Sequence, residues 1–364
     1  MSYTTFGVND TNAVKLWAKE LAKAERDSLD IAPLMDEDDN AIIQIKTMTQ
    51  KGKGDKITFS LRARPTQKGI TEGQTAEGNG ESLTFYADAV YINELGSNFG
   101  TNSDDTIDAQ RVPFNLRTEC KNSAADWWKD RKSASFFNQV CGYTPANTES
   151  STSGSVYCGL NTVTAPSGAS GLTRQIWAGS ASNDQGLTSS DTFTVALIDR
   201  AVEAARTGNR MIRPVMVGGQ PKYVMYLHEA QVTALRTNAG TNGWLDITKA
   251  ALTGESTTKN PIYTGALGEW NGTILRRNQD VTLGVNSTSA TTSVANVRRA
   301  VLLGAQSAVC AYGMKNGSRY RWHEALLDAG RRLEVSAWGI WGLKKSVFNS
   351  VDHGVLVVSS YSSS

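Results

Sequence analysis

Histidine and cysteine, which supply many metal sites and catalytic triads, are scarce in this sequence. Only three histidines and four cysteines occur among 364 residues, and the cysteines at 120, 141, 158 and 310 form no C-x-x-C pair. Neither a G-x-S-x-G nucleophile elbow nor a G-x-x-x-x-G-K-[ST] phosphate loop is present. These absences argue against the common hydrolases and nucleotide-binding enzymes. The sequence does not exclude a pair of catalytic carboxylates, because the distance between two such groups depends on the fold.

Two segments, 228–229 and 323–324, begin like the zinc-binding pattern H-E-x-x-H. The second histidine of the pattern falls on Val232 in one case and on Leu327 in the other, so neither segment can complete a zinc site. We expect both histidines to be solvated or hydrogen-bonded structural residues.

An acidic turn matches part of a calcium-binding EF-hand loop. Asp36, Asp38 and Asn40 occupy the first three ligand positions, but Ala41 stands where the loop needs glycine and Thr47 where it needs glutamate. We expect a solvated acidic turn. The sequence thus predicts no catalytic residue, no metal and no cofactor.

Strong net charge and long apolar runs are also missing. The net charge is +2 with 20% charged residues, so no strong field recruits nucleic acid. The longest apolar run, residues 300–314, is interrupted by Gly304, Gln306 and Ser307 and indicates a core strand. Neither this run nor the charged amphipathic helix expected at 11–28 resembles a membrane span or a signal peptide.

A long polar hairpin is the first feature that the sequence does contain. Residues 56–64 alternate polar and apolar side chains as a half-buried strand does, Pro65 breaks the pattern, and residues 81–95 return as a second extended run. The hairpin has too little apolar surface to pack on its own chain, and a two-stranded ribbon is marginal in water. We expect a neighbouring copy of the chain to supply the missing surface.

An unusually long helix is expected at residues 113–141. Pro113 suits a first helical position, and Gly142 and Pro145 end the helix. The result is a rod of about 40 Å, either a thick core helix or a spine packed on both sides. Mostly apolar residues recur at spacings of three and four and form one stripe along the helix. They are Leu116, Cys120, Ala124, Trp127, Arg131, Ala134, Phe137 and Cys141.

Disulfides are not expected. Cys120 and Cys141 lie about 30 Å apart on this helix, beyond the reach of a disulfide. We expect buried thiols in the reduced form, which fits synthesis in a cytoplasm.

The rest of the chain alternates loops with short elements. Residues 142–190, rich in Ser, Thr, Gly and Asn, are expected to be a loop insertion. A helix follows at 191–207 with Asp191 as its N-cap and Gly208 as its stop, and another at 231–236. Strands are expected at 42–46, 222–227, 274–276, 300–304 and 338–343.

Several blocks of this sequence resemble the N4-like major capsid proteins of tailed bacteriophages. They follow one another from residue 6 almost to the end of the chain, and their order and number carry the resemblance. The blocks are Phe6-Gly-Val-Asn-Asp, Gly54-Asp-Lys-Ile-Thr-Phe, Glu77-Gly-Asn-Gly-Glu-Ser-Leu, Gln110-Arg-Val-Pro-Phe, Ala125-Asp-Trp-Trp, Phe136-Phe-Asn-Gln, Asn260-Pro-Ile-Tyr-Thr-Gly-Ala-Leu-Gly-Glu, Gly342-Leu-Lys-Lys-Ser-Val-Phe-Asn and Asp352-His-Gly-Val.

The resemblance implies an α+β, HK97-like capsid fold. It would have an N-terminal arm (1–50), an extended E-loop hairpin (51–100), a peripheral domain (101–215) with the spine helix 113–141 and the insertion 142–190, and an axial domain (216–364) with strands returning to the peripheral domain. Shell closure would favour glycine hinges, and we expect them at Gly52, Gly54, Gly96 and Gly100.

The implied function is structural. As a major capsid protein, the chain would self-assemble into hexamers and pentamers of an icosahedral shell that encloses double-stranded DNA without binding it specifically. Scaffolding, decoration and portal proteins are the further partners that such a family allows, and no membrane is involved. The place of action would be the virion capsid, assembled in the host cytoplasm.

The implied contact surface includes the charged residues of the hairpin and of the acidic turn. The basic residues would pair with acidic residues of a neighbouring copy, although they can also simply keep an edge strand soluble. Nucleic-acid binding is the weaker interpretation, because few aromatic residues that could stack on bases lie nearby. The candidates are Lys51, Lys53, Lys56, Arg62, Arg64 and Lys68 on the hairpin, and Asp36, Asp38 and Asp39 on the turn.

A glycan-binding or glycan-active surface protein of a phage or bacterium is the alternative. Its loops rich in Ser, Thr, Asn and Gly and its nine tryptophans would serve sugar stacking. The tryptophans are dispersed, however, and the repeat pattern of an all-β fold is missing.

Overall fold

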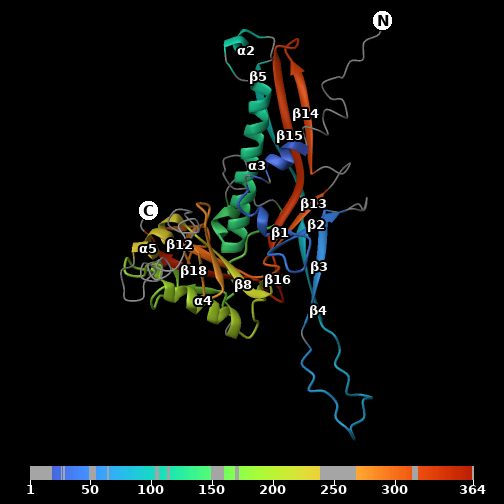
Figure 1. Cartoon of the computed structure of the whole chain (residues 1–364), viewed down its shortest axis with the longest axis vertical. Helices are drawn as coiled ribbons and strands as arrows, with labels where there is room; N and C mark the ends of the chain where they lie inside the picture. Colours follow the sequence, from blue (N-terminus) through green and yellow to red (C-terminus); the bar gives the residue numbers. More distant parts are fainter. Residues whose placement is uncertain are drawn as a thin grey trace.

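Two β-sheets make up the body of the chain, one long helix contacts both, and a β-hairpin projects from them (Figure 1). The structure is a computed structural model that describes residues 19–25, 27, 29–48, 55–63, 65–102, 106–111, 113, 115–148, 160–168, 172–237, 268–313 and 319–362. Within these residues, no helix is long and apolar enough to cross a membrane.

The first sheet has six strands and lies along the long helix (Figure 1). β2 runs parallel to β13, whereas β13, β14 and β5 are antiparallel to β15. Strands from distant parts of the sequence therefore meet in one sheet. In spatial order they are β1 (Met35–Asp36), β2 (Ile43–Met48), β13 (Ala308–Gly313), β15 (Arg332–Lys345) and β14 (Tyr320–Leu327), with β5 (Asn93–Asn102) also on β15.

The second sheet has eight strands, and the helices α4 (Val195–Thr207) and α5 (Glu229–Thr237) pack on it. Its main path is β6 (Gln175–Trp177), β18 (Val355–Tyr361), β12 (Ser293–Leu303), β8 (Gln220–Leu227), β10 (Thr273–Arg277) and β9 (Glu269–Trp270), with β11 (Leu283–Val285) on β12 and β7 (Val215–Val217) on β8. The short helices are α2 (Ile107–Arg111), η1 (Ala32–Leu34), η2 (Thr144–Asn147) and η3 (Asp184–Gly186).

The C-terminal part of β12, residues 300–303, is buried on both faces, which explains its continuous apolar sequence. Val301 and Leu303 belong to the core that contains the long helix, while Ala300 and Leu302 belong to the core beneath α4 and α5. A strand that is covered on both sides needs apolar residues at successive positions. The second sheet is thus a layer between α3 and the two smaller helices.

The long helix, α3 (Leu116–Cys141), begins at Leu116, so the predicted start at Pro113 was wrong. Asn115 is the N-cap: its side-chain oxygen accepts a hydrogen bond from the backbone N–H of Thr118 at 3.0 Å and satisfies a donor that the helix leaves free. Gly142 ends the helix in the left-handed conformation, with φ of 65°. The 26 residues span about 39 Å, as predicted.

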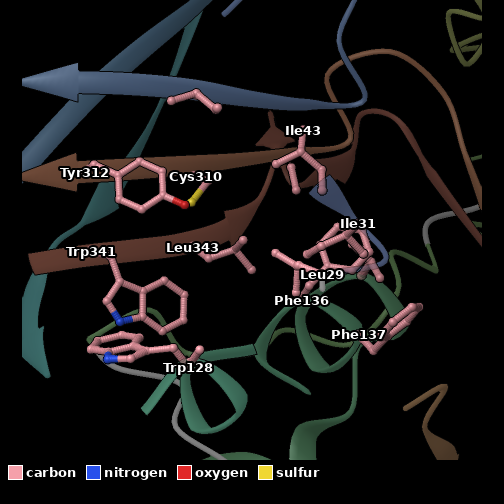
Figure 2. Packing of buried hydrophobic residues seen from close by; sticks show 14 of the residues in the cluster. Leu29, Ile31, Ile43, Trp128, Phe136, Phe137, Cys310, Tyr312, Trp341 and Leu343 are labelled. Atoms are coloured by element: carbon pink, nitrogen blue, oxygen red, sulfur yellow. The ribbon is translucent and has the colours of Figure 1, made fainter. Parts of the chain in front are cut away.

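Burial around α3 changes along its length. Trp128 is fully buried, whereas Trp127, a member of the predicted stripe, is only partly buried. From residue 135 to 141 every side chain is buried, and the Phe137 ring lies 5.3 Å from that of Tyr226 in the second sheet. Figure 2 shows Trp128 of α3 beside Trp341 of the first sheet. The helix is therefore a spine packed on both sides, the second of the two interpretations.

The apolar run at 300–314, predicted as one core strand, forms two strands in different sheets. β12 ends at Leu303 in the second sheet, and β13 begins at Ala308 in the first. Gly304 permits the crossing, because a Cβ there would lie 2.4 Å from the Arg213 carbonyl oxygen. The chain crosses back through the small hairpin β16 (Val347–Phe348) and β17 (Val351–Asp352).

α4 begins at Val195, so the predicted N-cap Asp191 was wrong. The carboxylate of Asp191 instead accepts hydrogen bonds from the Thr188 backbone N–H at 2.9 Å and the Thr188 hydroxyl at 2.8 Å, which closes a turn before the helix. Gly208 ends α4 as predicted. The predicted strands at 222–227, 274–276 and 338–343 and the helix at 231–236 are confirmed within longer elements. The strands predicted at 42–46 and 300–304 are confirmed except for one end residue each, because β2 begins at Ile43 and β12 ends at Leu303.

The hairpin consists of β3 (Lys56–Arg62) and β4 (Phe85–Tyr91), paired antiparallel along their full lengths. Val90 is fully buried against the first sheet, and Ile57 and Phe59 pack on the same small cluster. The base of the hairpin therefore packs on its own chain, contrary to the sequence-based expectation.

Gly96 is a packing residue, and the expectation of a hinge there was wrong. It lies inside β5 opposite Trp338, and a Cβ would meet the Trp338 ring at 2.4 Å. Gly100, also inside β5, has open space around it. The other two predicted hinges, Gly52 and Gly54, lie outside the described residues.

A buried ion pair joins the helical residues 19–25 to α3. Lys132 Nζ lies 3.0 Å from Glu25 Oε1, and both side chains are 3% exposed. The same ammonium group donates hydrogen bonds to the hydroxyls of Tyr312 and Tyr320. A second pair, Lys121 and Glu20, joins the same two segments nearer the surface.

We expect Lys132→Met to lower the free energy of unfolding by about 3–5 kcal/mol, because it leaves the Glu25 carboxylate buried without its partner. The matched control, Lys121→Met, should cost less than about 1 kcal/mol, since that pair is solvated. Denaturant unfolding followed by tryptophan fluorescence measures both values. Equal losses in the two variants would contradict the assignment.

Candidate assembly surface

The stem of the hairpin has one face toward the body and one toward solvent. Alternate residues of β3 are half-buried and exposed, as the sequence predicted. On the exposed face, Lys56 lies 5.7 Å from the Tyr91 ring, and Arg62 lies opposite Phe85, whose side chain is 60% exposed. The outer face thus offers cationic and aromatic side chains together.

Two polar contacts fix the direction in which the stem leaves the body. The Asp88 carboxylate accepts hydrogen bonds from the Lys344 ammonium group and from the Val347 backbone N–H. The Asn161 side chain binds the backbone of Tyr91 twice, accepting from its N–H at 2.9 Å and donating to its carbonyl at 2.7 Å. Because these contacts tie β4 to strand β15 and to residue 161, the stem is a fixed extension of the body.

Beyond the stem, residues 65–84 form what we call the distal loop. Every one of these residues is exposed, and Figure 1 shows the loop extending far from both sheets. It includes the exposed apolar side chains of Ile70 and Leu83. A segment of this length that the described part of its own chain leaves exposed is a candidate for contact with another chain.

Glu81 holds the two sides of the distal loop together. Its carboxylate accepts hydrogen bonds from the backbone N–H groups of Thr66 and Gln67, at 2.9 and 2.7 Å, and from the Thr66 hydroxyl at 2.9 Å. These donors lower the pKa of Glu81 below its usual value. The carboxylate is therefore protonated less readily than a glutamate without these donors.

The basic candidates that the structure describes are Lys56, Arg62 and Lys68, and all three are exposed. No ion pair within the described part of the chain includes any of them. Their pairing with a neighbouring copy stays a prediction. The other three basic candidates, Lys51, Lys53 and Arg64, lie outside the described residues.

The acidic candidates are exposed too, but their oxygens are engaged locally. Asp36 and Asp38 each accept a hydrogen bond from the next backbone N–H. Asp39 accepts from the side-chain amides of Gln44 at 2.9 Å and Gln306 at 3.2 Å. The turn therefore closes on itself as a solvated acidic turn and lies on the body, not on a projecting segment.

The partial metal motifs come together nowhere in the described residues, which hold no group of three possible metal ligands. His228 precedes α5, where its Nδ1 accepts a hydrogen bond from the Ala230 backbone N–H at 3.2 Å. His323 lies exposed on β14. Cys120, Cys141 and Cys310 are buried free thiols, as predicted, and burial raises the pKa of Cys141 to about 11.

A pocket of about 340 Å³ opens at the base of the stem, between the hairpin and the crossing at β16–β17. Leu61, Tyr86, Met211, Phe348 and His353 are among its lining residues. We call it the stem pocket.

Cationic side chains surround His353 in the stem pocket. Burial, together with the charges of Arg174, Arg213 and Arg210, lowers the pKa of His353 from 6.5 to about 4. Its imidazole packs edge-on against the Phe348 ring at 5.4 Å.

Sequence reasoning located the hairpin and its charges but missed Asp88, Asn161 and the stem pocket. Asn161 lies in the polar stretch predicted to be a loop insertion, where one asparagine carries no distinguishing signal. Arg174 and Arg210 come from separate connections, so only the folded chain shows them together.

A body held by buried contacts and a fully exposed loop are the features of a subunit of a structural assembly. A family model described as phage capsid protein matches residues 5–364. The chain therefore belongs to the phage capsid protein family, and its place is the virion capsid.

Solved capsid structures agree with this assignment. The capsid of Ralstonia phage GP4 is 30% identical, with a TM-score of 0.76 over 100% of this chain and 99% of that chain. The cyanophage Pam1 capsid (19% identity, TM-score 0.71, 91% and 92% covered) and the capsid of Helicobacter pylori bacteriophage KHP30 (15%, 0.64, 92% and 92%) share the fold. The α+β, HK97-like prediction is confirmed. No curated protein sequence matches the chain, and the matches give the glycan-binding alternative no support.

We expect Glu81→Gln to loosen the distal loop without changing the stability of the body, because the clamp joins only loop residues. Hydrogen exchange of residues 65–84 should accelerate, and limited proteolysis should cut there first. Glu77→Gln is the matched control, since Glu77 lies in the same loop outside the clamp. Unchanged exchange in Glu81→Gln would show that the clamp does not order the loop.

We expect His353 to make the subunit less stable in acid. The unfolded chain takes up the proton near pH 6.5 and the folded chain only near pH 4, so stability present above pH 6.5 is lost as the pH falls toward 4. The loss is at most about 3 kcal/mol. The free energy of unfolding of His353→Gln should vary less across this window than that of wild type. The exposed control His323→Gln should follow wild type, and identical profiles for all three proteins would refute the assignment.

Proposed function

We propose that the chain is the major capsid protein of a tailed phage, and that its copies form hexameric and pentameric capsomers of an icosahedral shell around double-stranded DNA. The observation that carries the proposal is the exposed distal loop on an HK97-like body. A loop that buries nothing in its own chain has a physical reason to exist when another copy covers it. The function is structural and not catalytic.

We further propose membership of the N4-like group. The blocks of sequence that resemble this group run in order through almost the whole chain, from Phe6-Gly-Val-Asn-Asp to Asp352-His-Gly-Val.

The domain division is part of the proposal, in a form refined by the sheets. Residues 1–50 would be the N-terminal arm and 51–100 the E-loop. α3 and the first sheet would form the peripheral domain, and the second sheet would form the axial domain. Because β6 and α4 join the second sheet, the proposal assigns residues 175–207 to the axial domain, whereas the sequence-based division included them in 101–215.

In the shell, each E-loop would lie across the spine region of the adjacent subunit. The exposed basic residues of the hairpin would pair with acidic residues of that neighbour. Each contact is modest, but a subunit that makes several at once gains strongly from their combined geometry.

Scaffolding, decoration and portal proteins complete the proposed set of partners. The DNA would be enclosed without specific binding, which agrees with a net charge of only +2. Assembly in the host cytoplasm agrees with three buried free thiols.

We expect the purified chain to form shells, tubes or capsomer rings visible by negative-stain electron microscopy, alone or with the phage scaffolding protein. Replacing residues 66–83 by Gly-Gly should abolish these particles, because it removes the proposed contact. The thermal unfolding midpoint of the subunit should stay unchanged, since every residue of the loop is exposed and none packs on the described part of its own chain.

A variant that keeps the loop but carries Glu203→Lys on the exposed face of α4 serves as the control. Normal particles from the loop-deleted chain would refute the role of the loop. Failure of wild type to assemble under both conditions would refute the capsid proposal itself.

A further inference from the structure

The stem pocket contains positive charge that its own chain does not neutralise by direct pairing. Arg174, 3% exposed, donates from Nε to the Asp352 carbonyl at 3.1 Å and from Nη2 to the Arg210 carbonyl at 2.6 Å. Arg210 donates from Nη1 to the Phe348 carbonyl at 2.9 Å, and its guanidinium lies 5.8 Å from the Tyr86 ring. Within the described residues, no carboxylate forms an ion pair with either arginine.

The nearest acid is committed elsewhere. Both carboxylate oxygens of Asp352 lie 3.1 Å from the ammonium group of Lys345, and the Ser167 backbone N–H donates to one of them. Backbone carbonyls thus orient the two guanidinium groups, and within the described residues the nearby Asp352 carboxylate acts on Arg174 only through space, without an ion pair. Arginine held in this way is suited to receive a carboxylate from outside.

The distal loop presents carboxylates in the complementary way. Glu72 and Gly73 occupy the centre of a turn closed by a hydrogen bond from Gln74 N–H to the Thr71 carbonyl at 3.1 Å. Glu77 and Gly78 occupy the centre of the next turn, closed from residue 79 to residue 76.

Both turns depend on glycine. φ is +88° at Gly73 and +82° at Gly78, a conformation that glycine adopts without strain. Each turn therefore displays one glutamate at the tip of the loop.

These glutamates are free to bind another molecule. No hydrogen bond or ion pair to a described residue engages Glu72 or Glu77, whereas Glu81 is used by the clamp. The other acidic candidates, the turn at 36–39, are engaged by their own backbone and by two amides on the body. Glu72 and Glu77 therefore differ from Glu81 and from the acidic turn, because they lie on the projecting loop and have no partner among the described residues.

We propose that Glu72 or Glu77 from the distal loop of one copy enters the stem pocket of a second copy and pairs with Arg210 and Arg174. This inference rests on the proposed assembly function and names the partner surface within it. The exposed apolar residue Met211 at the pocket rim would contact the loop beside the ion pair.

The proposed contact joins two different surfaces of the same chain. A loop tip that binds a neighbour's pocket leaves its own pocket free for the next copy, so the interaction is head-to-tail. Contacts of this kind close into rings when the rotation between copies allows it. The geometry therefore agrees with a capsomer ring and needs no partner other than the chain itself.

Charge reversal tests the pair. Glu72→Lys/Glu77→Lys alters only exposed loop residues and should reduce the yield of sedimenting particles by at least about tenfold. Arg210→Glu should do the same, and combining it with the loop reversal should restore at least part of the yield. The control Glu203→Lys should assemble normally.

Disulfide trapping tests proximity without relying on charge. Glu72→Cys and Glu77→Cys are each combined with Met211→Cys, and at least one of the two pairs should give a ladder of covalent multimers on non-reducing gels after mild oxidation of assembled particles. Glu77→Cys with Glu203→Cys should give no ladder, and the described native cysteines are buried.

The outcomes separate the two proposals. Normal assembly of the loop-reversal variant, or particles without a ladder, would overturn the pocket contact and leave the capsid function standing. Absence of particles even from wild type would instead refute the assembly function. Arg210→Glu particles that assemble normally but package less DNA would show that the pocket binds nucleic-acid phosphate, which also overturns the proposal.

Discussion

The structure depends on how the buried end of α3 is satisfied. The last carbonyl groups of a helix have no partner within it and carry partial negative charge. Arg299 of β12 supplies the donors: its Nη1 binds the carbonyls of Cys141 and Gly142 at 3.1 and 2.9 Å, and its Nε binds Asp184 at 2.8 Å. Asp184 in turn accepts from the Trp177 side chain and the Val285 backbone. One buried ion pair therefore joins the spine to three elements of the second sheet.

Two other buried ion pairs also join separate parts of the fold. Glu25 and Lys132 join the N-terminal residues to the middle of α3, and Lys345 and Asp352 lie where the chain crosses from the first sheet to the second. A buried charge without its partner is strongly destabilising, so each pair favours the one arrangement of the chain that brings both partners together. The body is consequently specified by three buried ion pairs in addition to its apolar cores, and the pairs Glu25–Lys132 and Asp184–Arg299 join distant parts of the sequence. A rigid body of this kind can hold a projecting loop in a constant direction, which repeated assembly requires.

The sequence predicted those features that depend on local pattern. The length of α3 follows from its periodicity, and the half-buried strand β3 from its alternation. The helix was predicted to begin at Pro113, but it begins after Asn115, whose side chain accepts a hydrogen bond from the Thr118 N–H and caps the helix. The folded geometry is needed to see this hydrogen bond. The two strands within 300–314 were merged because burial on both faces makes both apolar throughout. Asp88, Asn161 and Arg174 could not be found from sequence, since each acts on a residue far away along the chain.

The same distinction separates the carboxylates of the distal loop from those of the acidic turn. Asp36 and Asp38 satisfy neighbouring backbone donors, so their charge is already used to shape a turn. Glu72 and Glu77 lie on glycine turns whose backbone closes without their side chains. Removing such a free carboxylate from water is costly unless a cation pairs with it. In the proposed contact, the guanidinium groups of Arg174 and Arg210 in the stem pocket would be these cations. Sequence composition counts all of these residues equally as acids. The fold separates those that shape the subunit from those left available to its neighbours.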